Sequence, residues 1–266
     1  FQHLWQNYLK ITPSAEKIHH LLEEREHHQS ADTSNLVNDH IALRTFNIDK
    51  VNLNKLAAHF IALGYEEKEQ YQFEQKKLQA KHFEHSNHTS PKVFISELLV
   101  EQMSNEVQTI INKMLEPVSD DVSLQEHFLY SGTHWQVSQQ EYEFLAEHSE
   151  YAAWMAAWGF RANHFTISIN HMQTINSVEQ MNHVIKQAGY ELNSAGGEVK
   201  GGPEVLLAQS STMADKILLN FTDGSKLVPS CFYEFALRYA MANGELYQGF
   251  VAASADKIFE STNRNN

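Results

Sequence analysis

A pattern that occurs twice in the chain is the strongest constraint on its fold. A strand-like run led by a histidine begins at His40, and a second one begins at His164. Each run is followed by a helical pattern that ends in Gly-Tyr-Glu, and the two glycines are Gly64 and Gly189. The histidine and the glycine are 24 residues apart in the first copy and 25 in the second. A strand, a helix closed by glycine and a new strand at matched spacing predict a duplicated module.

Each copy continues through further strand-like segments to one that carries a glutamate. Glu97 lies in the first such strand, and Glu234 lies in the second. One strand, one helix and three further strands in each copy predict an α+β fold built from paired βαβββ modules. Two histidines and two glutamates in corresponding places are the residue types of a metal centre between duplicated halves. In the second copy the three further strands are expected at about 204–209, 216–221 and 228–235.

The rest of the chain divides around these modules. Ser138 and Glu141 fit a capping box at the start of a helix. The apolar run 151–160 is too short to span a bilayer, so it predicts a helix buried between the modules. We therefore expect N-terminal helices in 1–34, a first module in 35–116, a helical connector in 117–160, a second module in 161–242 and a C-terminal tail in 243–266.

The first histidine-led strand carries, on one face, two side chains that are costly to bury. Alternation with a period of two places His40, Ala42 and Arg44 on the same side. An imidazole and a guanidinium are expensive to bury unless a charged group lies between them. A metal beside His40 and a carboxylate ligand beside Arg44 would supply that group. The alternative is a core histidine with an arginine that reaches the surface.

The composition restricts the classes of molecule that the chain can bind. The chain of 266 residues has 20 basic and 33 acidic residues, which is a formal net charge of −13. That charge argues against nucleic acid and anionic membranes, and an anionic substrate would need positive charge placed locally. No apolar run reaches the roughly 18 residues of a spanning helix, and no secretory leader opens the chain. The single cysteine, Cys231, excludes an internal disulfide, and we expect a cytoplasmic location.

Three short motifs together resemble one enzyme family. They are Asn38-Asp39-His40 with Arg44, Asn163-His164, and Cys231-Phe232-Tyr233-Glu234-Phe235-Ala236. In this order they resemble the 2-oxoadipate dioxygenase/decarboxylase family of the vicinal oxygen chelate superfamily, over most of residues 35–240. The resemblance implies that the paired modules form a cupped mixed sheet around a metal. The chain is shorter than the better-known members, whose longer C-terminal part contributes to the pocket.

The resemblance also implies a site and a reaction. It implies that His40, His164 and Glu234 hold Fe(II) and that Arg44 binds the substrate. The implied reaction converts 2-oxoadipate and O₂ into 2-hydroxyglutarate and CO₂. Three protein ligands leave about three positions on an octahedral ion, which is enough for a chelating 2-oxo acid and for O₂.

Three further residues are candidates for this site. Ser230 and Arg238 share the strand parity of Glu234, so Ser230 could bind substrate and Arg238 could pair with a carboxylate behind the ligands. Glu97 is a candidate fourth ligand. It would give a His₂Glu₂ centre, which suits Ni²⁺ or Zn²⁺ lyase and isomerase chemistry of the glyoxalase kind.

A third alternative is a non-enzymatic module of the same fold that binds a small ligand. The expected partners are a small 2-oxo acid and O₂, with no nucleic acid and no membrane. The sequence leaves open whether the chain forms a homo-oligomer.

Overall fold

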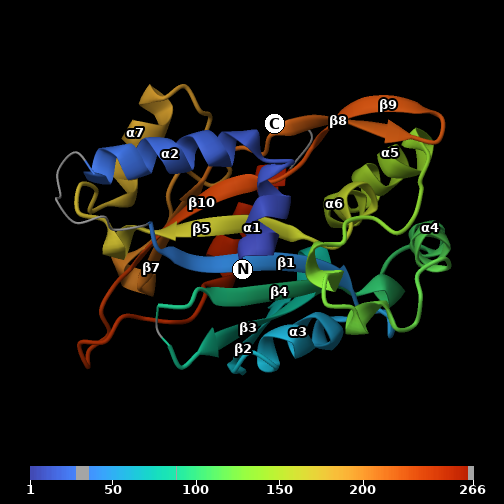
Figure 1. Cartoon of the computed structure of the whole chain (residues 1–266), viewed down its shortest axis with the longest axis horizontal. Coiled ribbons are helices and arrows are strands. Elements are labelled where there is room, and N and C mark those ends of the chain that lie inside the picture. The colour runs from blue at the N-terminus through green and yellow to red at the C-terminus, as the bar shows by residue number, and fades with distance from the viewer. Residues whose placement is uncertain (28–35, 88, 263–266) are drawn as a thin grey trace.

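One curled sheet of eight strands forms the centre of the computed structural model, which describes residues 1–27, 36–87 and 89–262 (Figure 1). Across the sheet the strands follow the order β2 (Tyr65–Phe73), β3 (Leu78–His85), β4 (Lys92–Leu98), β1 (Asn38–Phe46), β5 (Ala162–Ser168), β10 (Phe232–Arg238), β7 (Leu207–Ser211) and β6 (Lys200–Gly202).

The two halves of this sheet repeat one topology. β1 and β5 run antiparallel at the centre. β4 runs parallel to β1, and β10 runs parallel to β5. Outside them, β3 and β2 in one half and β7 and β6 in the other continue antiparallel. The predicted pair of βαβββ modules is therefore confirmed, with the sheet neighbours in the same order outward from the centre.

Turns in equivalent places support the duplication. The 3₁₀ turn η1 (Glu74–Lys76) is followed by Lys77 with a φ of 54°, and η6 (Pro203–Val205) is followed by Leu206 with a φ of 63°. Among the described residues, these are the only non-glycine residues with positive φ. A left-handed residue that carries a side chain is costly, so its presence at both places marks one inherited turn.

The predicted glycines lie just beyond the module helices. α3 (Leu53–Ile61) precedes Gly64, and α7 (Val178–Gln187) precedes Gly189. Their φ values are +91° and +86°, a conformation that glycine adopts without the steric cost of a Cβ atom. Both glycines therefore end a helix as the sequence predicts.

The second module contains an insertion that the sequence analysis did not separate. The strand expected at 228–235 is interrupted at Ser230 and Cys231, which divide it into β9 (Gly224–Pro229) and β10. β8 (Lys216–Phe221) and β9 form a two-stranded sheet of their own. Proline at the end of β9 cannot donate a ladder hydrogen bond, so pairing stops there.

Helices cover the outer face of the sheet. α1 (Gln2–Leu9) and α2 (Pro13–His27) lie across β5 and β10 (Figure 1). The ring of Trp5 packs 4.9 Å from that of Phe165. α3 and α7 pack against strands of their own modules. α4 (Asn105–Leu115) ends the first module, and the connector forms α5 (Gln139–His148) and α6 (Glu150–Trp158).

The connector agrees with its predicted features. The capping box of Ser138 and Glu141 is present at the start of α5. Every residue of α6 from Tyr151 to Trp158 is buried, as expected for a helix that is apolar all round.

The C-terminal segment lies on the opposite, inner face. α8 (Ala252–Ile258) and the turn η7 (Phe259–Thr262) follow the last sheet strand, and α8 contacts β2, β6 and β7. Because β2 and β6 are the two edges of the sheet, the segment predicted as a tail bridges both modules up to Thr262; residues 263–266 lie outside the described residues.

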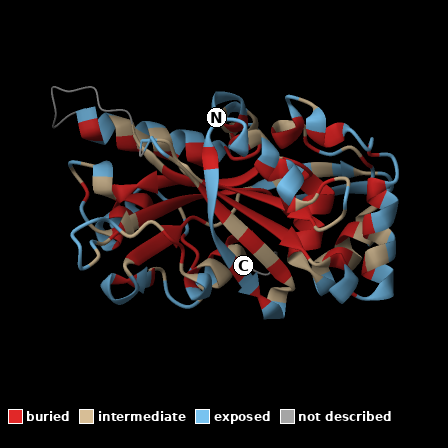
Figure 2. Cartoon of the chain, turned by 90° about the horizontal axis from the view of Figure 1, so that it is seen from below, coloured by how far each residue is buried: buried red, intermediate tan, exposed pale blue. Residues whose placement is uncertain are grey.

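Buried residues follow the strands through the middle of the molecule, and exposed residues gather on the peripheral helices and loops (Figure 2). None of the helices in the described ranges has the length and apolar character needed to cross a bilayer.

Candidate metal centre

Three adjacent strands bring His40, His164 and Glu234 together on the inner face of the sheet. His40 on β1 and Glu234 on β10 both pair with Thr166 of β5, one from each side. His164 lies two residues before Thr166, so it shares the same face. One ligand atom from each of the three side chains lies within 4.8 Å of the others. The Nε2 atom of His40 is 3.5 Å from Oε1 of Glu234, and that of His164 is 3.2 Å from Oε2.

Both histidines are held in one orientation by the residue before them. Nδ1 of His40 lies 2.7 Å from Oδ1 of Asp39, and Nδ1 of His164 lies 3.0 Å from Oδ1 of Asn163. These oxygens accept hydrogen bonds, so each Nδ1 carries the proton and donates it. Each Nε2 therefore presents a lone pair toward Glu234. Such partners set the tautomer and orientation of metal-binding histidines.

An ion pair lies behind His40. Arg238 donates from Nε and Nη2 to the two carboxylate oxygens of Asp39, at 2.7 and 2.9 Å. Burial by itself would raise the pKa of Asp39, but the Arg238 guanidinium and His40 hold that pKa well below its usual range. Asp39 is thus a carboxylate, and it links Arg238 to the imidazole of His40.

The charges of the three side chains suit a divalent cation. Burial lowers the pKa of His40, against the effect of Asp39, and lowers that of His164 well below its usual value, so both imidazoles are neutral. Burial raises the pKa of Glu234 to about 8, although Gln209 donates to its Oε1 at 2.6 Å. Oε2 of Glu234 is buried without a hydrogen-bond partner. Once Glu234 has lost its proton, three acceptor atoms converge here, and a bound cation would compensate all of them.

Arg44 is a buried cation on the same face. Its guanidinium lies 5.0 to 5.4 Å from the ring centres of Tyr151, Trp154 and Phe259. Its hydrogen-bond partner is the hydroxyl of Thr262, at 3.4 and 3.5 Å, and its Nε atom has none. Burial lowers its pKa to about 10, so it stays charged at neutral pH. The carboxylate of Glu150 acts on it electrostatically, and a guanidinium buried among aromatic rings favours an anionic ligand.

A family model described as 2-oxoadipate dioxygenase/decarboxylase matches residues 1–246. The chain belongs to this family. It is 35% identical to the Arabidopsis thaliana protein named 2-oxoadipate dioxygenase/decarboxylase, chloroplastic, over 96% of this chain and 74% of the relative. The family resemblance of the sequence motifs is therefore confirmed.

Two solved structures are similar along nearly the whole chain. A Shewanella frigidimarina protein described as a hydrolase is 58% identical, with a TM-score of 0.89, and the match covers 95% of this chain and 96% of that one. The Oryza sativa hydroxyglutarate synthase, solved in complex with 2-oxoadipate, is 33% identical with a TM-score of 0.89, and the match covers 99% of this chain and 91% of that one.

The location expected from composition is contradicted. The curated plant relatives in this dioxygenase/decarboxylase family are named chloroplastic, or chloroplastic/amyloplastic. Transit peptides are separate segments, so the charge, hydropathy and cysteine content of a folded domain do not report its compartment. The cytoplasmic prediction is wrong on this comparison.

Glu97 does not join the ligand cluster. The pairing registers of the two modules align Glu234 of β10 with Phe94 of β4, three residues before Glu97. An odd offset along a strand places Glu97 on the opposite face. There its carboxylate accepts hydrogen bonds from the backbone N–H of Leu53, at 2.6 Å, and from the side chain of Gln79, at 2.5 Å. The set that the structure assembles contains one glutamate, which removes the basis of the His₂Glu₂ alternative.

Ser230 also lies away from the ligands. Its hydroxyl donates to the backbone carbonyl of Ile11 at 2.5 Å, and its backbone N–H donates to that of Asp215. It precedes β10, where the chain leaves the β8–β9 hairpin, so strand parity does not extend back to it. Arg238 does share the face of Glu234, and its partner is the carboxylate of Asp39.

The sequence analysis missed residues that complete the site. Asp39 and Asn163 each precede a module histidine, and this recurrence was a signal that could have identified their role. Nothing in the sequence marked Gln209, the partner of Glu234. The same holds for Phe250 and Phe259, which come from the C-terminal segment and line the cavity at the ligand cluster.

Proposed function

We propose that the chain is a non-haem Fe(II) dioxygenase/decarboxylase that converts 2-oxoadipate and O₂ into 2-hydroxyglutarate and CO₂. The observation that supports this most is one buried sheet face with a His-His-Glu set and, four residues along β1 from His40, the guanidinium of Arg44. Two histidines and one carboxylate with open positions are typical of non-haem Fe(II) oxygenases. The 2-oxoadipate complex of the Oryza sativa relative supports the choice of substrate.

His40, His164 and Glu234 hold the iron in this proposal. Fe(II) bound there supplies a chelation point for the 2-oxo acid and the activation of O₂. Asp39 and Asn163 keep the Nδ1 protons in place, so both Nε2 atoms carry lone pairs. The hydroxyl of Thr166 lies 3.1 Å from Nε2 of His40 and turns its hydrogen away when the metal binds. Glu234 gives up its carboxyl proton when the metal binds, because burial raises its pKa to about 8.

Arg44 binds the distal carboxylate of the substrate in this proposal. About four residues at roughly 3.3 Å each separate its Cα atom from that of His40 by about 13 Å, and side chains from both ends shorten this to the length of a small dicarboxylate. The rings of Tyr151, Trp154 and Phe259 around the guanidinium exclude water and strengthen a charge-assisted bond. Holding the far end of the acid determines which carbon faces the metal.

Oxygen uptake tests the proposal. Protein loaded anaerobically with Fe(II) is mixed with 2-oxoadipate, and dissolved O₂ and released CO₂ are followed together. We expect one CO₂ for each O₂ consumed and no uptake by His40→Ala. A second substrate, 2-oxohexanoate, has the same chain length but lacks the distal carboxylate, and wild-type protein should use it poorly.

Two results would contradict the proposal. Uptake that survives in His40→Ala would show that the ligand cluster is not the reacting site. Equal use of 2-oxoadipate and 2-oxohexanoate by wild-type protein would show that Arg44 does not select for a second carboxylate.

A further inference from the structure

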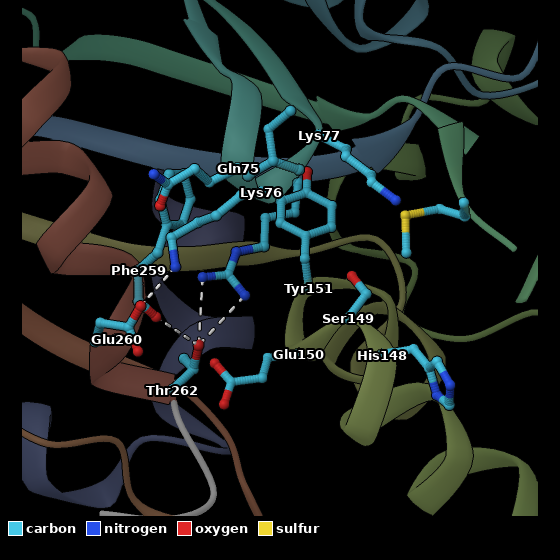
Figure 3. Close-up of a pocket in the computed structure, with 13 residues that line it drawn as sticks. Gln75, Lys76, Lys77, His148, Ser149, Glu150, Tyr151, Phe259, Glu260 and Thr262 are labelled. Atoms are coloured by element: carbon cyan, nitrogen blue, oxygen red, sulfur yellow. Dashed lines mark hydrogen bonds and ion pairs between the residues drawn. The ribbon is translucent and has the colours of Figure 1, made fainter. Parts of the chain in front are cut away.

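Two cavities meet at Arg44. The inner cavity is lined by His40, His164 and Glu234 among others. The outer cavity is lined by residues of η1, α6 and η7 (Figure 3). Arg44 and Phe259 line both of them. The guanidinium and this ring therefore form the wall between the ligand cluster and the outer cavity.

The inner cavity is much narrower than the outer one. The space that the centre of a water molecule can reach is about 30 Å³ in the inner cavity and about 420 Å³ in the outer cavity. The outer cavity has exposed residues at its edge, including Gln75 and His148. Its size and its exposed edge make the outer cavity the side from which a ligand can approach Arg44.

The outer cavity has more basic than acidic side chains in its lining, although the protein as a whole is acidic. Arg44, Lys76 and Lys77 line it, against the carboxylates of Glu150 and Glu260, while the whole chain has a formal net charge of −13. The duplicated half lacks this feature, because Val205 of η6 is the counterpart of Lys76. The shared turn therefore does not require a cation at this position. Lys76 is specific to the module that carries Arg44.

Lys76 already has an internal partner, the carboxylate of Glu260. Nζ of Lys76 lies 2.5 Å from Oε1 of Glu260, and both side chains are about one-quarter exposed (Figure 3). Glu260 belongs to η7, which also contributes Phe259 to the wall and Thr262 to the guanidinium of Arg44. A carboxylate that replaced Glu260 at Lys76 would break the ion pair between η7 and η1, beside the wall that closes the inner cavity.

We propose that the outer cavity is the entrance and first binding site for the anionic substrate, where Lys76 exchanges Glu260 for a substrate carboxylate before Arg44 receives it. This inference rests on the proposed function for the identity of the ligand, a 2-oxo dicarboxylate. It adds a site, a cation and an internal competitor to that function. The exchange breaks one ion pair and forms another, so no covalent bond changes.

Kinetics of three variants test the inference. Lys76→Gln should lower kcat/KM for 2-oxoadipate by about 5-fold at low ionic strength, with the loss in KM, because one steering and binding charge is removed. The difference from wild type should shrink as salt rises to about 1 M. Glu260→Gln should raise kcat/KM, because Lys76 no longer has its competitor. The matched control is Lys113→Gln, which breaks another 2.5 Å lysine–glutamate pair, with Glu141, outside the cavity and should change kcat/KM less than 2-fold.

Binding to chelator-treated protein separates this inference from the proposed function. The probe is glutarate, a dicarboxylate that has no 2-oxo group, and calorimetry at low ionic strength measures its affinity for wild type and Lys76→Gln. Weaker binding to the variant supports the entrance site, even if wild type shows no activity on any 2-oxo acid and the proposed function fails. Equal affinities, or no binding by wild type, would overturn the inference and leave the proposed function standing. Equal kcat/KM values for Lys76→Gln and wild type would overturn it as well.

Discussion

Replacing Asp39 with asparagine removes one charge and almost no volume from the group behind His40. The carboxylate accepts from Nδ1 of His40 at 2.7 Å and from Arg238 at 2.7 and 2.9 Å. The exposed fractions of the three residues are 6%, 2% and 4%. An asparagine oxygen can still accept from His40. The substitution leaves the buried guanidinium of Arg238 without the carboxylate that pairs with it.

The expected cost follows from that burial. Removing one partner of a buried ion pair costs about 3–5 kcal/mol of unfolding free energy, because the remaining charge stays buried. Arg238 keeps hydrogen bonds to the backbone carbonyls of Tyr247 and Gly249, so we expect the lower end, about 3 kcal/mol. Metal affinity should fall by about 10- to 100-fold, since the carboxylate no longer strengthens His40 as a ligand.

Two measurements separate these effects. Urea unfolding of chelator-treated protein gives the free energy of unfolding, and an anaerobic Fe(II) titration against a competing chelator gives the affinity. Glu198→Gln is the control, because it breaks the exposed pair with Lys186 and should cost less than about 1 kcal/mol without changing metal affinity. If Asp39→Asn binds metal as tightly as wild type and unfolds within about 1 kcal/mol of it, the assigned role of this carboxylate is refuted.

Three further predictions concern other buried groups. Arg44→Ala should raise the apparent Kd of 2-oxoadipate by at least about 10-fold while Fe(II) affinity stays the same; an unchanged Kd in a substrate titration would contradict this. Glu97→Gln should leave one metal per chain, by elemental analysis, but should cost about 1–2 kcal/mol in urea because the carboxylate accepts the N–H of Leu53 at the start of α3; loss of metal would restore it as a ligand. Burial raises the pKa of the Cys231 thiol to about 12, so folded protein should not react with a thiol reagent at pH 8. Because the unfolded thiol loses its proton first, near its ordinary pKa of about 8.5, stability should fall as pH rises from about 9 toward 12, and serine in this place should reduce that slope in urea titrations.

The choice between the two glutamates shows what local sequence patterns cannot predict. Glu97 and Glu234 end comparable strands in the sequence, and both have the residue type of a ligand. The strand registers make Phe94 of β4, and not Glu97, the position that corresponds to Glu234 of β10. The β8–β9 hairpin, which the described residues of the first module lack, shifts Glu234 along the chain relative to the rest of its module. Strand register depends on hydrogen bonds between distant segments, and an odd shift reverses the face that a side chain occupies.

The sequence did not show which distant segments meet. Strand parity indicated that Arg238 could pair with a carboxylate, but its partner, Asp39, is 199 residues away, and the residues of η7 that contact Arg44 are more than 200 residues beyond it. The resemblance to the dioxygenase/decarboxylase family supplied the roles of the ligands. It did not show that the segment predicted as a tail folds over them.

The sequence by itself determined the duplicated modules, the helix ends at Gly64 and Gly189 and the equivalence of His40 and His164. These features depend on alternation, capping and spacing within a few residues, which the chain records directly. The tertiary structure decided which glutamate faces the histidines, which ion pair lies behind His40 and what covers the inner face of the sheet. Those outcomes depend on register and packing between segments that meet only when the sheet closes.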